Sequence, residues 1–164
     1  MTIQYGAMSA DGRFVVFVTR AINLTPDKLN SDFQDIFVRD MVAGTTKLVS
    51  ANAWGTASGN RQSWPPRISA HGRFVVFLSR ASDLVYNDNN DPPGSFGCED
   101  IFVRDIQLGV TTLASMNRFG TNSGNQCAYF NSYDISGDGH RVVFASAASA
   151  LVANDTNNAS DVFL

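Results

Sequence analysis

The sequence predicts an all-β protein assembled from repeated units of four antiparallel strands. The string Gly-Arg-Phe-Val-Val-Phe occurs at 12–17 and at 72–77, and a diverged copy, Gly-His-Arg-Val-Val-Phe, occupies 139–144. Only 16% of the residues are charged, while Asn, Ser, Thr and Gly are abundant, which is typical of β proteins with many turns. Since the copies recur about every 60 residues, the chain is an array of units and not one irregular domain.

Each unit carries signals for four strands in the same order. In the first unit, 9–12 predicts the end of one strand and a tight Asp-Gly turn, and 14–17 predicts a second strand that is apolar at every position. Residues 36–38 predict a similar third strand, and the Thr-rich run 45–50 predicts a more exposed fourth strand. The second unit begins with 64–68, which contains two prolines. Because proline cannot donate a ladder hydrogen bond, we expect this strand at a sheet edge.

The later units keep this register. Asp-Ile-Phe-Val-Arg-Asp occupies 35–40 and 100–105, and Asp-Val-Phe-Leu closes the chain at 161–164. The residues that lengthen the second period fall at 86–99 and 127–133. Insertions in repeat proteins fall in loops, so we expect a loop at each place.

The apolar second and third strands must be covered on both faces. Four-stranded antiparallel meanders packed between neighbours around an axis are the blades of a β-propeller, whereas sandwich strands alternate apolar and polar positions. We therefore predict about three propeller blades, at about 1–51, 52–116 and 117–164, with the last strand of the third blade missing. Together they form a partial ring or a ring that completes itself.

The quoted strings, followed by Gly-x-Thr-x-Leu, resemble the TolB-like, WD-like β-propeller repeat family, in the long variant common in secreted bacterial proteins. The resemblance covers nearly the whole chain. It implies a ring of six or more blades and implies little about activity. Three blades leave two apolar faces uncovered. We expect further blades of a longer chain, or self-association such as a two-fold dimer that completes six blades, with an open stack as a third arrangement.

Charge and hydropathy exclude two classes of partner. The net charge is −3 and the isoelectric point is about 5.1, so the chain lacks the basic footprint of nucleic-acid binding. No apolar run reaches the roughly 18 residues of a membrane span. Residues 1–5 lack the basic and apolar regions of a signal peptide, so we expect the chain to start inside the folded unit, as a mature or cut fragment or as a cytoplasmic protein.

The two cysteines predict a disulfide. Cys98 lies in the loop between the second and third strands of unit two, and Cys127 lies in the link to unit three. That loop and that link emerge on the same face of a meander blade, so the two residues can meet. The alternative is two free thiols in a reducing compartment. A disulfide and the resemblance both favour an extracellular or periplasmic location.

Oxygen-rich loops precede the third strands and have two interpretations. We name as candidate calcium ligands Asp155, Asn157 and Asp161 in unit three, and Asp88 and Asn90 in unit two. Oxygen ligands at alternate positions suit a hard cation, and integrin-type propeller loops use a similar pattern. The central glycine of such loops is missing here, and unit one carries Lys28. The alternative is that Asp and Asn make turns that cap the next strand.

No catalytic motif is present. His71 and His140 occupy turn positions that the other units fill with Asp11 and Arg13, and no Gly-x-Ser-x-Gly elbow occurs. We therefore predict a protein without catalytic residues and without a cofactor other than calcium.

Residues that do not recur are the candidates for a binding surface, because scaffold residues recur with the repeat. The recurring Arg13/Arg73 and Asp40/Asp105 pairs predict blade-to-blade ion pairs or turn anchors. The non-recurring candidates for a partner surface are Tyr86, Phe96, Tyr129, Phe130 and Tyr133.

The leading hypothesis is a non-enzymatic binding or structural scaffold, a propeller segment for protein–protein association or self-assembly outside the cytoplasm. The alternative is an accessory propeller domain of a secreted hydrolase whose catalytic domain is absent from this chain. A third hypothesis, a propeller enzyme with a site in the central channel, has only Arg67 and Asp134 on the innermost strands to support it.

Overall fold

The computed structural model describes residues 6–28, 32–90 and 97–164, and every helix or strand within these ranges is a β-strand. The strands are β1 (Gly6–Met8), β2 (Phe14–Thr19), β3 (Asp35–Asp40), β4 (Thr45–Leu48), β5 (Arg67–Ile68), β6 (Phe74–Ser79), β7 (Asp100–Asp105), β8 (Val110–Leu113), β9 (Ala128–Ile135), β10 (Val142–Ser146) and β11 (Asp161–Phe163). The described residues include no helix long and apolar enough to cross a membrane.

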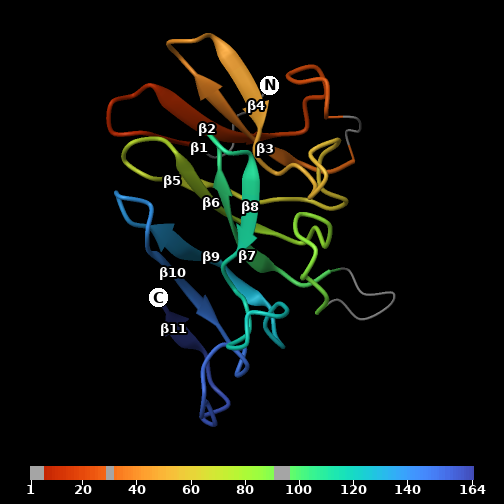
Figure 1. Ribbon diagram of the computed structural model, residues 1–164, viewed down its shortest axis with the longest axis vertical. Coiled ribbons are helices and arrows are strands. Elements are labelled where there is room, and N and C mark those ends of the chain that lie inside the picture. Colours follow the sequence, from red (N-terminus) through yellow and green to blue (C-terminus); the bar gives the residue numbers. More distant parts are fainter. Residues whose placement is uncertain (1–5, 29–31, 91–96) are drawn as a thin grey trace.

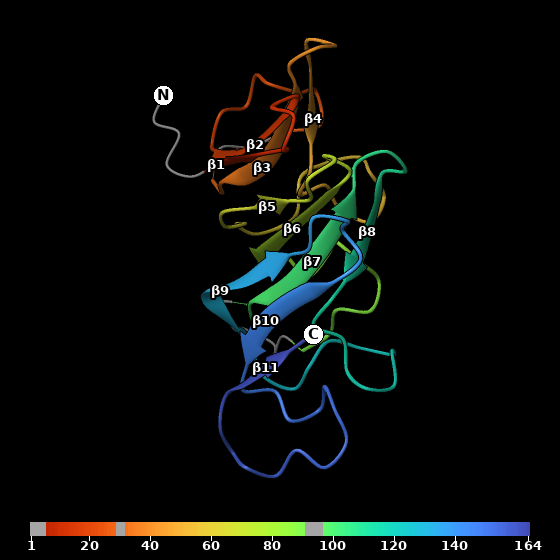
Figure 2. The ribbon, with the colours of Figure 1, turned by 90° about the vertical axis from the view of Figure 1, so that its left-hand side faces the viewer.

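The strands form three antiparallel meanders, one after another along the chain. The first sheet has the order β1-β2-β3-β4, the second β5-β6-β7-β8, and the third β9-β10-β11. Figure 1 shows the sheets in a row from red to blue, and Figure 2 shows the row from the side. These sheets are propeller blades, called blades 1, 2 and 3 below. They lie within the predicted boundaries, and blade 3 has three strands in the part of the chain that the structure describes.

The repeated apolar string forms the second strand of each blade. In blade 1 it pairs with β3 from Phe14 opposite Asp40 to Thr19 opposite Asp35, and blade 2 repeats this register. The first strand of blade 2, β5, is an edge strand, as predicted, and Pro65 and Pro66 lie just before it. The outermost strands β4 and β8 are mostly exposed, which agrees with their polar sequences.

The core lies between the blades, as predicted from strands that are apolar on both faces. One cluster joins Val16, Val18, Ile36 and Val38 of blade 1 to Val75, Phe77, Phe102 and Leu113 of blade 2. A second joins Val76, Leu78 and Ile101 of blade 2 to Tyr133, Phe144 and Leu151 of the third unit. Successive side chains of a strand point to opposite faces, so each central strand contributes to both of its neighbours.

The two blade junctions repeat the same backbone contact. The Ala10 amide donates to the Ala70 carbonyl (2.8 Å), and the Ala70 amide donates to the Gly137 carbonyl (2.9 Å). These residues hold the same position in the three units, so the hydrogen bonds form a ladder from blade to blade.

The turn glycines allow close packing at these junctions. A methyl group on Gly72 would lie 2.2 Å from the Phe14 ring, and one on Gly139 would lie 2.3 Å from the Phe74 ring. Both glycines also have positive φ, 79° and 74°, which side chains disfavour. Glycine recurs in this turn because the preceding blade's aromatic ring lies against it.

The prediction of a loop at 127–133 was wrong for most of that segment. Residues from Ala128 onward form β9, whose pairing with β10 shifts between Phe144 and Ser146. Asn131 has a φ of 57° within this β-bulge. A bulge absorbs extra residues without ending the strand, so the insertion lengthens β9 in place of forming a loop.

Candidate binding surfaces

A disulfide joins blades 2 and 3. Cys98 and Cys127 are bonded, with their Cα atoms 5.1 Å apart. Cys98 lies just before β7 and Cys127 just before β9, and next to the bond the Ala128 amide donates to the Glu99 carbonyl (2.7 Å). The predicted pairing is present, because the residues just before β7 and just before β9 lie side by side.

Aromatic side chains gather beside this disulfide. Phe130 lies edge-on to Trp64, with ring centroids 5.7 Å apart, and the Arg80 guanidinium lies over the same indole. Arg80 also pairs with Glu99 (2.5 Å). Tyr129 and Phe130 are 44% and 48% exposed, so the bulge presents two rings to solvent, and their role as a partner surface stays a prediction.

Tyr133 is not part of this exposed surface, and its assignment there was wrong. It is 7% exposed and packs between blades 2 and 3, and its hydroxyl donates to the Pro65 carbonyl. Burial raises the pKa of Tyr133 to about 12. The bulge determines which face of the sheet the Tyr133 side chain points to, because beyond Asn131 the strand returns to regular pairing, with Phe144 opposite Tyr133. Phe96 lies outside the described residues.

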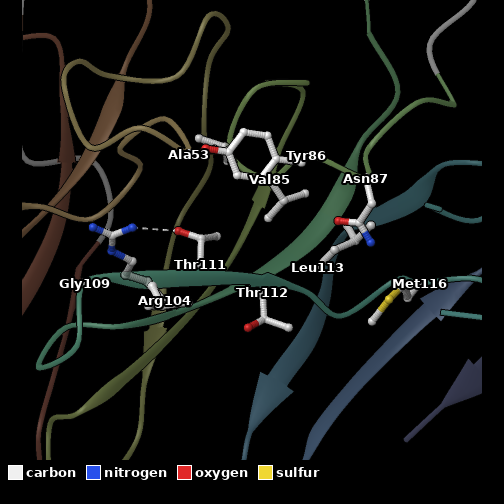
Figure 3. Close-up of a pocket in the computed structure, with 12 residues that line it drawn as sticks. Ala53, Val85, Tyr86, Asn87, Arg104, Gly109, Thr111, Thr112, Leu113 and Met116 are labelled. Carbon is white, nitrogen blue, oxygen red and sulfur yellow. Dashed lines mark hydrogen bonds between the residues drawn. The ribbon is translucent and has the colours of Figure 1, made fainter. Parts of the chain in front are cut away.

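Tyr86 stands at the mouth of a groove near blade 1. It is 73% exposed and lies edge-on to Trp54, with ring centroids 5.9 Å apart. The groove has a volume of about 440 Å³. Its lining, shown in Figure 3, is Ala53, Leu84, Val85, Tyr86, Asn87, Arg104, Gly109, Val110, Thr111, Thr112, Leu113 and Met116. A smaller hollow shares Arg104 and Gly109 with it and reaches Lys47 and Leu48 of blade 1.

Arg104 supplies the cationic group of this groove. Its Nη1 donates to the Thr111 hydroxyl (2.9 Å), the dashed contact of Figure 3. Burial lowers the pKa of Arg104 below its ordinary value, while Asp27 and Asp105 act against that shift. Arginine stays charged through such shifts. Among the described residues, no carboxylate oxygen lies within 4.0 Å of a guanidinium nitrogen of Arg104.

The predicted calcium ligands of blade 3 make the hydrogen bonds of a turn. The Asn157 amide nitrogen donates to both Asp161 oxygens (3.2 and 3.0 Å), and the Asn157 oxygen accepts from the Ala159 amide (2.9 Å). Asp155, Asn157 and Asp161 line one shallow hollow in the surface. These contacts are those of the alternative interpretation, in which Asn and Asp cap the next strand.

Blade 2 shows a related contact. The Asn90 amide donates to Asp100 (2.9 Å) and to the Gly124 carbonyl (3.1 Å), and Asp88 is buried nearby in the chain. No group of three or more His, Cys, Asp or Glu side chains suited to a metal occurs among the residues described.

In blade 1 a lysine takes the place of these amides. Lys28 donates to Asp35, the first residue of β3, and both side chains have 0% exposure. The Ser50 hydroxyl also donates to Asp35 (2.7 Å). Burial raises the pKa of Asp35, and the Lys28 ammonium and the Ser50 hydroxyl oppose that rise. The sequence marked Lys28 only as an obstacle to calcium and did not reveal this pair.

The recurring charges and the histidines are turn residues. Arg13 pairs with Asp40 (2.8 Å) and Arg73 with Asp105 (2.7 Å), in each case across one blade and not between blades. His71 is exposed and contacts the Asp138 carbonyl of blade 3 through Nε2 (3.1 Å). These residues hold the scaffold, as the turn-anchor interpretation predicted.

No protein-family profile and no curated protein matches the chain. Among solved structures, the chain is similar to that of the tricorn protease, a β-propeller protein, with a TM-score of 0.54 and 14% sequence identity. The chain has a propeller-like fold. The match covers 89% of this chain and 11% of the protease chain, so at this identity it shows the fold alone.

Proposed function

We propose that the chain is a non-enzymatic binding and structural scaffold, a propeller segment that associates with other blades or proteins outside the cytoplasm. The observation that carries the proposal is the open outer face of blade 3. Val162 is 74% exposed and Leu164 is 87% exposed. Their counterparts in blade 2 are Ile101, which blade 3 buries completely, and Val103, which is partly buried.

The outer face of blade 1 is open to a smaller extent. Met8 and Met41 are 68% and 59% exposed, whereas their counterparts Ile68 and Ile106 pack partly buried at the junction with blade 1. Phe37 on the same sheet is already buried, in a cluster that includes Leu24. An incoming blade would therefore cover the rim of this face more than its centre.

Association with further blades of this kind would repeat the contacts that already join blade 1 to blade 2 and blade 2 to blade 3. The backbone ladder through Ala10, Ala70 and Gly137 can extend at both ends, and a two-fold dimer of three-bladed chains gives six blades. One position departs from the pattern, since Arg141 stands where Phe14 and Phe74 contact the next blade's glycine. A neighbour of blade 3 meets a guanidinium there and not a ring.

Two finer assignments belong to this proposal. The TolB-like, WD-like repeat family is supported by the repeated strings and the meander blades. An extracellular or periplasmic location is supported by the disulfide, because disulfides persist mainly outside the cytosol. The alternative function, an accessory propeller of a secreted hydrolase, uses the same open faces to contact the rest of the enzyme.

Replacing Val162 with Asp tests the open face. We expect Val162→Asp to weaken association at least about tenfold, because a carboxylate cannot be buried against an apolar neighbour without a partner. The matched control is Val42→Asp, at a position that is 78% exposed. Its counterpart in blade 2, Gln107, stays exposed although blade 1 covers that side of blade 2, so an added blade is not expected to bury Val42. Sedimentation equilibrium measures both. Equal association of the two variants would contradict the proposal.

Urea unfolding in the presence of calcium or magnesium tests whether the loop before β11 binds calcium. Binding would require the Asn157 amide to turn its oxygen toward the ion and release Asp161. The observed hydrogen bonds favour the turn interpretation, so we expect the same urea midpoint of unfolding in about 5 mM calcium or magnesium, a concentration that fills extracellular sites. A rise with calcium alone, lost in Asp161→Asn, would establish the metal site.

A further inference from the structure

The groove at Arg104 is complete within one chain. Its walls come from blade 2 and from the link that contains Ala53, and the adjoining hollow reaches Lys47 of blade 1. It therefore exists whether or not the open blade faces are covered, and an occupant of the groove is independent of the association proposed above.

One wall of the groove is the edge of a β-sheet. The run Gly109 to Leu113 lines it without a break, and β8 is the outermost strand of blade 2. Successive side chains of a strand point to opposite faces of the sheet, yet consecutive residues of β8 all line the groove. The strand therefore presents its backbone edge to the groove as well as side chains. An edge strand carries amide and carbonyl groups that point away from its one partner, and an extended peptide can pair with them.

The remaining walls provide specificity. Val85, Leu84 and Met116 make an apolar floor, and Tyr86 and Trp54 flank the mouth. Arg104 is a partly buried cation that donates a hydrogen bond to the neutral Thr111 hydroxyl, and Lys47 adds a second positive charge in the adjoining hollow. A guanidinium in a partly dehydrated groove favours a carboxylate.

We propose that this groove binds an extended peptide segment that pairs with the free edge of β8 and places a carboxylate on the Arg104 guanidinium. In an extended peptide, alternate residues face the same side, so an acidic residue flanked by apolar residues two positions away matches the cation and the apolar floor. The partner is thus a protein with an exposed acidic strand-like segment.

The test uses two synthetic peptides, acetyl-Val-Thr-Glu-Thr-Val-amide and its Gln analogue, titrated into the ¹⁵N-labelled chain. We expect amide shifts at Thr111 to Leu113, and affinity about tenfold higher for the Glu peptide, because hydrogen bonds to charged groups are the stronger ones. Arg104→Met removes this preference. Arg104→Lys, which keeps the charge and the fold, reduces it.

Arg39 provides the matched control. It donates to Thr46 (3.1 Å) as Arg104 donates to Thr111, but it lies in blade 1 and lines no part of this groove. Arg39→Met therefore retains the preference for Glu. The proposal is overturned if neither peptide shifts the β8 amides at millimolar concentration, or if Arg104→Met and Arg39→Met behave alike. Shifts produced by a glucuronate disaccharide and not by the peptides would also overturn it.

Discussion

Replacing Lys28 with Ala is expected to lower the free energy of unfolding by about 3–5 kcal/mol, the typical cost of breaking a buried ion pair. The substitution leaves the Asp35 carboxylate at 0% exposure without its ammonium partner. Urea denaturation followed by tryptophan fluorescence measures the loss. The double variant Lys28→Met/Asp35→Asn serves as control, because removing both charges leaves no unpaired ion and recovers most of the stability. A loss below about 1 kcal/mol for Lys28→Ala would show that the pair is solvated.

The pH dependence of this variant has a definite sign. Burial raises the pKa of Asp35 above its unfolded value of 3.8, so the folded state binds more protons between the unfolded and the folded pKa. Stability therefore falls as pH rises through that window, and without Lys28 the window extends to higher pH, so the total fall is larger. The deficit of Lys28→Ala relative to the unmodified chain is expected to shrink as pH is lowered, because Asp35 can then be protonated.

Removing the disulfide is expected to cost about 3.5 kcal/mol, the chain-entropy value for a closed loop of this size. The bond spans 29 residues and ties β9 of blade 3 to the loop before β7. The double variant Cys98→Ala/Cys127→Ala measures the cost without free thiols, and hydrogen exchange locates the effect at β9. An intact mass that does not increase by about 2 Da on reduction would contradict the bond.

Much of the fold could be predicted from the sequence because one physical requirement governs it. A strand that is apolar at four successive positions, such as Phe14 to Phe17, needs a neighbour on each face, and a 60-residue period then specifies stacked blades. The turn glycines and the edge position of β5 follow from backbone chemistry alone.

The rest depended on contacts that a linear pattern does not encode. The bulge at Asn131 let β9 absorb an insertion and turned Tyr133 inward, so a residue counted as surface became core. Lys28 pairs with Asp35, seven positions further along the chain, and a linear pattern does not predict that contact. The Arg104 groove arises between separate segments, and in the sequence Arg104 looked like a repeat residue equivalent to Arg39.

The mass of the unmodified chain in solution tests the central claim most directly, that open blade faces make this propeller segment associate. Light scattering after size exclusion is expected to show a concentration-dependent rise from the 17.7 kDa of one chain toward twice that mass. A folded species that stays at 17.7 kDa at every concentration would contradict self-completion of the ring.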